Sequence, residues 1–74
     1  MSKTIYSEDH KLIVQRLKEA RNEAGLDQEA VAEKMGKTQS YVSKLESGQR
    51  RIDLIQLKEL AKIYNKDLEF FITK

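Results

Sequence analysis

The 74-residue sequence contains no cysteine, no proline and no tryptophan. Without cysteine there is no disulfide framework and no thiolate metal site, which suits a cytoplasmic protein. No apolar run approaches the roughly 20 residues that cross a bilayer, and the first residues, MSKTIYSEDHK, lack the apolar segment of a signal peptide. We therefore expect a cytoplasmic protein with no membrane partner.

Residues suited to catalysis or metal binding are also scarce. His10 is the only histidine, and no carboxylates accompany it at metal-ligand spacing. The sequence has neither an activated nucleophile nor a glycine-rich phosphate loop. We expect no enzyme activity, no metal, no cofactor and no small-molecule ligand.

The net positive charge of the chain falls in one segment. The length allows one domain, spanning residues 1–74, and not two. The net charge is +2, but segment 37–51 alone carries +3. The charged residues of this segment are Lys37, Lys44, Glu46, Arg50 and Arg51. This distribution favours a polyanionic partner; a chance cluster of solvated charges is the alternative.

Apolar residues recur at helical spacing, and no useful length alternates with the period of a strand. We predict helices over about residues 8–24, 28–35 and 39–47, a fourth from Asp53 to Tyr64, and a short last one from Asp67 to Ile72. The expected N-caps are Ser7, Asp27, Thr38 and Asp53, the last in a capping box with Gln56. The expected stops are Gly25, Gly36, Gly48 and Asn65.

Residues 28 to 48, QEAVAEKMGKTQSYVSKLESG, are the most informative segment. They predict two short helices joined by a tight turn, and several small or apolar side chains can face inward together. These are Val31, Ala32, Met35, Val42 and Leu45. The outward residues of the second helix are instead amides, hydroxyls and a lysine. This is the pattern of a DNA-binding helix-turn-helix.

The stretch LDQEAVAEKMGKTQSYVSKLESG resembles the lambda-repressor and Cro-type helix-turn-helix family, also called the Xre family. The shared positions are Leu26, Gln28, Ala32, Gly36, Gln39, Val42, Leu45 and Gly48. The resemblance covers residues 8 to 72. It implies an all-α, compact five-helix domain whose helix-turn-helix, at about residues 28–48, binds double-stranded DNA.

The second helix of this motif carries the candidate base-reading residues. Gln39 leads, because an amide donates and accepts at once and so matches the N7 and N6 edge of adenine. Ser40 follows, and Lys44 lies one turn further along the same face. Ser43 borders the groove. Ordinary solvent-facing roles are the alternative, and for Ser43 they are nearly as well supported.

A second group is expected to contact DNA phosphates. Lys37, Arg50 and Arg51 flank the reading helix, and such contacts set register and affinity without reading sequence. Gln28 opens its helix, where an anion is favoured, and the resemblance implies that it also braces Gln39. The Tyr41 hydroxyl could bond a phosphate, although packing alone is an equal alternative.

Arg21 and Glu46 are expected to form a structural pair. In many members of the family that the sequence resembles, an arginine late in the first helix pairs with a glutamate late in the third, and both positions match. Arg21 also follows Ala20 on the buried stripe of its helix, where a charge needs a partner. The pair would lock the angle of the third helix.

The last helix has more apolar residues than a small core can accept. We expect one or two of Phe70, Phe71 and Ile72 to be exposed in a monomer, which usually marks an interface. With Leu54 and Ile55 they predict a two-fold homodimer through residues of about 53–72, where family members of this size commonly dimerise. The alternative is that Phe70 and Phe71 pack on opposite sides of the fourth helix.

The sequence thus predicts a bacterial or phage-encoded transcriptional regulator, in the first instance a repressor, that binds an inverted-repeat operator as a homodimer. A restriction–modification controller protein or an antitoxin-type autorepressor stays open. A protein-interaction module that has lost DNA binding is the alternative of a different class. It would predict a neutral or acidic third helix, whereas this one is polar to basic.

Overall fold

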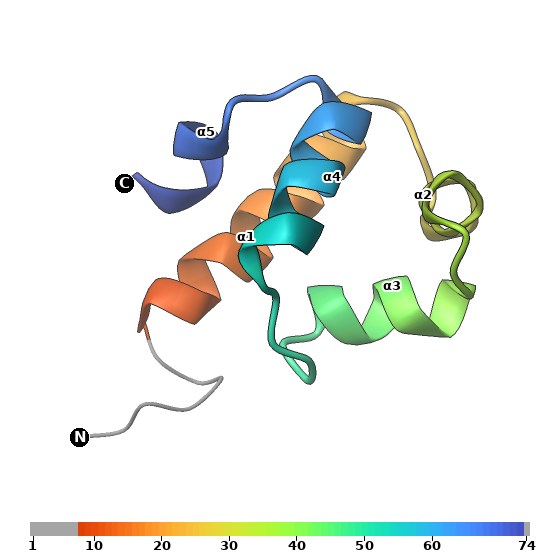
Figure 1. Cartoon of the computed structure of the whole chain (residues 1–74), viewed down its shortest axis with the longest axis horizontal. Coiled ribbons are helices and arrows are strands. Elements are labelled where there is room, and N and C mark those ends of the chain that lie inside the picture. Colours follow the sequence, from red (N-terminus) through yellow and green to blue (C-terminus); the bar gives the residue numbers. More distant parts are fainter. Residues whose placement is uncertain (1–7, 74) are drawn as a thin grey trace.

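The computed structural model describes residues 8–73, which form five helices and no strand. In chain order they are α1 (Glu8–Glu23), α2 (Gln28–Met35), α3 (Gln39–Glu46), α4 (Leu54–Tyr64) and α5 (Leu68–Ile72) (Figure 1). The predicted all-α, five-helix class is confirmed. The first and third helices end one residue earlier than the sequence suggests. The N-cap expected at Ser7 lies outside the described residues.

Three helices begin directly after the residues whose side chains cap them. Asp27, Thr38 and Asp53 each accept a hydrogen bond from a backbone N–H three residues further on, at 2.8 to 3.1 Å. The Asp53 backbone N–H in turn donates to Gln56 Oε1, which completes a capping box. These bonds satisfy donors that a helix leaves open at its start, so the beginning of α3 is fixed locally.

The turn between α2 and α3 depends on a left-handed residue. Gly36 has φ +69°, a conformation that a side chain disfavours. The next amide, Lys37 N–H, then donates to the Ala32 carbonyl at 2.9 Å, which closes the end of α2. The chain can therefore reverse at once and start α3 across α2, as Figure 1 shows at its lower right.

All five helices contribute to one core. Its fully buried large side chains are Phe71, Leu17, Leu45, Leu60, Val31 and Val42. In Figure 1, α1 and α4 occupy the middle of the molecule, and α3 and α5 lie toward opposite ends. The molecule thus presents α3 on one side and the α4–α5 region on another.

Of the three apolar residues at the end of the chain, Ile72 is the exposed one, as the expectation of one or two exposed residues allows, but the placing of Phe71 in a dimer interface is wrong. Its side chain is 0% exposed, whereas Ile72 is 55% exposed and Phe70 is partly buried. Successive helical residues point about 100° apart, so three in a row cannot all face the core. Phe71 faces the core, and Phe70 contacts it edge to face with ring centroids 5.1 Å apart. The Phe70 ring itself lies beneath the cations of Arg16 and Lys66.

Candidate nucleic-acid interface

The outward face of α3 carries the four predicted base-reading residues. Gln39, Ser40 and Lys44 are exposed and Ser43 is half-buried. The opposite face of the helix is held by Val42 and Leu45, each 1% exposed. Burial of this apolar face fixes the rotation of α3, and its polar face is left to solvent.

The leading residue of that face belongs to a chain of side-chain hydrogen bonds. Gln39 Nε2 donates to Gln28 Oε1 at 2.7 Å, and Gln28 Nε2 donates to Glu46 Oε1 at 3.1 Å. Glu46 also accepts from Arg21, with Nε to Oε2 at 2.7 Å and Nη2 to Oε1 at 3.1 Å. We call these four residues the amide relay. It joins α1, α2 and both ends of α3.

The ion pair at the inner end of the relay is well shielded from water. The Glu46 and Arg21 side chains are 5% and 17% exposed. Arg21 Nη1 also donates to the Leu26 carbonyl at 3.0 Å, so the guanidinium bonds two segments at once. Hydrogen bonding to Glu46 raises the pKa of Arg21 above its ordinary value. The pair expected from the resemblance is therefore present, and it joins α3 to α1.

Three of the predicted phosphate contacts meet at one aromatic ring. Lys37 Nζ lies 5.2 Å and Arg50 Cζ 4.7 Å from the centroid of the Tyr41 ring, so both cations can interact with its π-system. The Tyr41 hydroxyl accepts a hydrogen bond from Gln56 Nε2. The ring thus contacts one cation that precedes α3 in the chain and one that follows it. Through its hydroxyl group, Tyr41 also joins α3 to α4.

The remaining two phosphate candidates are Arg51 and Gln28. Arg51 is exposed and lines a hollow of about 440 Å³ together with Arg50, Asp53 and Gln56. Gln28 is half-buried beside Gln39, where its second amide N–H is left for another acceptor. The predicted site is therefore distributed along the reading helix from its start to the loop after it.

This arrangement is matched by known proteins. The helix-turn-helix family matches residues 17–71. The chain belongs to the Xre-type helix-turn-helix family. A similar solved structure is that of the restriction–modification controller protein C.AhdI from Aeromonas hydrophila, with 35% sequence identity and a TM-score of 0.75 over 88% of this chain and 100% of that one. A search of curated proteins gives no match. The chain is thus a DNA-binding transcriptional regulator of this family.

The role of Gln56 beside this helix-turn-helix interface is not evident from the sequence. Gln56 is identifiable as the partner of Asp53 in a capping box, but its second bond, to Tyr41, joins residues 15 positions apart. No local pattern marks such a contact. Gln56 therefore links the reading helix of this family member to the start of α4.

Within residues 8–73, no three or more acidic or histidine side chains gather where they could hold a metal ion. No described helix combines the length and the apolar composition needed to cross a membrane.

Proposed function

We propose that this regulator binds an inverted-repeat operator as a homodimer and represses transcription where that operator overlaps a promoter. The observation that carries the proposal is the presentation of Gln39 at the exposed start of α3, held by Gln28. An amide fixed at this point of a recognition helix is suited to reading the edge of a base in the major groove. Repression then follows because the bound protein blocks access of polymerase.

The interface separates into two roles. Gln39 and Ser40 contact base edges at the start of α3, with Lys44 one turn further and Ser43 at the border of the groove. The phosphate contacts come from Gln28, Lys37, Tyr41, Arg50 and Arg51. Their contribution is independent of sequence and depends on salt, because neutralising phosphates releases counterions.

A second copy of the chain is the proposed partner of the α4–α5 side. Leu54, Ile55 and Ile72 are the exposed large apolar residues of the described chain, at 63%, 73% and 55%. Large apolar side chains left to solvent on so small a protein are suited to an interface with another chain. Phe70 is partly buried and so offers only part of its side chain to a partner. Phe71 is buried in the core and would support the interface only by holding α5 in place.

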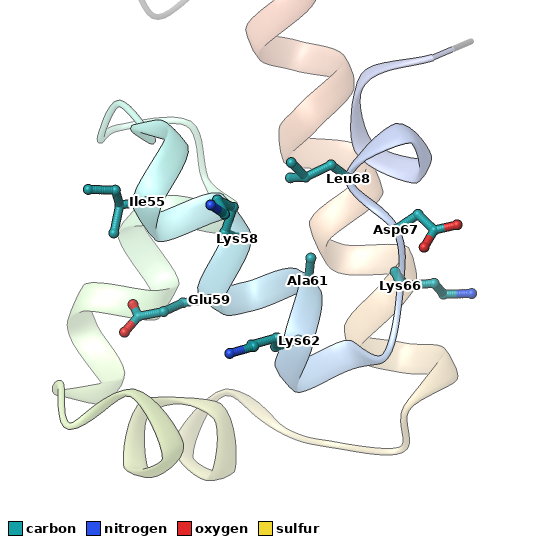
Figure 2. A pocket seen from close by; sticks show the side chains of 8 residues that line it. All are labelled: Ile55, Lys58, Glu59, Ala61, Lys62, Lys66, Asp67 and Leu68. Atoms are coloured by element: carbon teal, nitrogen blue, oxygen red, sulfur yellow. The ribbon is translucent and has the colours of Figure 1, made fainter.

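Charges beside these residues suit a two-fold contact between identical surfaces. Ile55 borders a hollow of about 440 Å³ between α4 and the segment that enters α5 (Figure 2). Glu59 and Lys62 project on the same side of α4 as Ile55 in this view. Because a two-fold axis pairs each surface with its own copy, the acidic and basic groups of one protomer can face their opposites on the other.

A controller protein of a restriction–modification system is the more specific candidate. It is favoured by the likeness to the C.AhdI controller, whose whole chain is matched. Such a regulator would act in the cytoplasm of a bacterium or be encoded by a phage. A neighbouring pair of endonuclease and methyltransferase genes would support this candidate, and a neighbouring toxin gene would favour the autorepressor instead.

Selection of bound duplexes from a random pool tests the proposed function. We expect an inverted repeat whose half-site centres lie roughly 34 Å apart. Gln39→Ala should then weaken cognate binding by roughly 1–3 kcal/mol and relax one base position in each half-site. Equal loss on cognate and scrambled duplexes would make Gln39 a backbone contact. A pool that yields no preferred sequence would overturn the proposal.

A further inference from the structure

The relay ends in a group that can only accept hydrogen bonds. Glu46 is an ionised carboxylate paired with Arg21, and it takes bonds from both the guanidinium and the Gln28 amide. An ionised carboxylate has no proton to donate. Gln28 must therefore turn Nε2, its donor end, toward Glu46.

The orientation of the Gln28 amide in turn determines the orientation of the Gln39 amide on α3. With its Nε2 at Glu46, Gln28 can turn only its carbonyl Oε1 toward Gln39. A carbonyl accepts and does not donate, so Gln39 must place its own Nε2 there, 2.7 Å away. Gln39 then has its Oε1 and one N–H left for DNA. These are the acceptor and the donor that an adenine edge requires.

We propose that Glu46 is a positioning residue that sets the direction of the Gln39 amide and, through it, the base that Gln39 prefers. The inference rests on the proposed function, since it requires Gln39 to meet a base edge. Glu46 itself is 5% exposed and lies at the far end of α3 from Gln39, so it acts through Gln28 and not by touching DNA.

The direction of the hydrogen bonds in the relay depends on the charge of Glu46 and not on its shape. A glutamine at this position has nearly the same shape. Its carbonyl would keep the shorter bond, from Arg21 Nε at 2.7 Å, because Arg21 only donates. Its NH₂ group would then take the place of Oε1, which gives up the 3.1 Å bond from Arg21 Nη2 and turns a donor toward Gln28. Gln28 and then Gln39 would each reverse, so that Gln39 accepts from Gln28 and presents both of its N–H groups to the groove. Two donors match guanine, whose major-groove edge carries the N7 and O6 acceptors.

Base preference at the Gln39 position is the measurement that tests this role. Binding of the wild type, Glu46→Gln and Gln28→Met is compared on four operators that differ only at that base pair, which Gln39→Ala first identifies. We expect the wild type to favour adenine over guanine by roughly 5- to 150-fold. Glu46→Gln should reverse the preference toward guanine, with the other operator positions unchanged.

Gln28→Met keeps the inference falsifiable if Glu46→Gln does not fold, because it leaves the Arg21–Glu46 pair intact. Methionine fills similar space but ends the relay, so the preference at this one base pair should fall several-fold. Loss of a phosphate contact alone would weaken all four operators equally. A folded Glu46→Gln or Gln28→Met protein that keeps the wild-type preference would overturn the inference. A wild type without any base preference would instead overturn the proposed function.

Discussion

The two ends of this small domain are held in place by different forces. On the α2–α3 side, Gln39 donates a hydrogen bond to Gln28, Gln28 donates to Glu46, and Glu46 also accepts from Arg21. On the α5 side, the central contact is the apolar side chain of Phe71, which is 0% exposed. Hydrogen bonds fix the orientation of polar groups, whereas apolar burial stabilises without fixing direction. The first arrangement suits recognition, and the second suits stability and assembly.

Substitutions on the two sides of the molecule should therefore change different measurable properties. Changes on the α2–α3 side should alter which DNA is bound and how binding depends on salt. Changes on the α4–α5 side should alter the free energy of unfolding or the oligomeric state. The following predictions test this separation, beginning with the largest effect.

Phe71→Ala should destabilise the fold by about 3–5 kcal/mol, because it removes a fully buried aromatic side chain and leaves a cavity. The α5 helix has only five residues and little stability of its own. Chemical denaturation followed by circular dichroism measures the loss. Ile72→Ala is the matched control, since its exposed side chain should cost no more than about 0.5 kcal/mol. Similar losses for both variants would contradict the assigned burial.

Ile55→Asp should weaken the proposed dimer while the fold is kept. The side chain is 73% exposed in the single chain, so the monomer loses little from the change. A two-fold interface contains the residue twice. If each copy contributes about 1.5 kcal/mol, the dissociation constant should rise roughly 100-fold. Sedimentation equilibrium measures it, and Ile55→Val should stay close to the wild type. A wild type that is monomeric with and without operator would rule out the dimer.

Single changes of Lys37, Arg50 or Arg51 to alanine should weaken binding to every duplex. Each should also reduce the slope of log binding constant against log salt concentration by about one unit. The reason is that each removes one expected phosphate contact without removing a base contact. Binding to cognate and scrambled duplexes is measured across a salt series. Lys58→Ala on α4 is the control, because that lysine borders the α4–α5 hollow and should leave the slope unchanged (Figure 2). An unchanged slope for all three variants would assign the phosphate contacts elsewhere.

The helices could be predicted from the sequence because their start and stop signals are local. Asp27, Thr38 and Asp53 each act on a backbone N–H three residues away. Gly36 and Asn65 end their helices in the left-handed conformation, with φ of +69° and +58°. None of these signals requires knowledge of the rest of the fold. The family resemblance added the long-range pairing of Arg21 with Glu46.

The features that the sequence does not give depend on how the helices meet. Three consecutive apolar residues in a five-residue helix contain no periodicity that identifies Phe71 as the buried one. The bond between Gln56 and Tyr41 depends on where the start of α4 lies relative to α3. The bond from Gln28 to Glu46 likewise joins opposite ends of the helix-turn-helix. The DNA-contacting roles of the α3 residues stay predictions.

The smallest predicted effect is the loss of stability when the residue before α3 or before α5 is replaced. Thr38 caps α3 by accepting from the Tyr41 backbone N–H at 3.1 Å, whereas the Asp67 side chain makes no such bond at the start of α5. Thr38→Ala should therefore cost about 1 kcal/mol, the usual loss for an N-cap. Asp67→Ala loses only a surface charge near the helix dipole, which should cost about 0.5 kcal/mol or less. Paired urea denaturation curves measure both. Equal costs would show that α5 depends on a directed polar contact as α3 does, and the contrast between the two sides would then not extend to their helix starts.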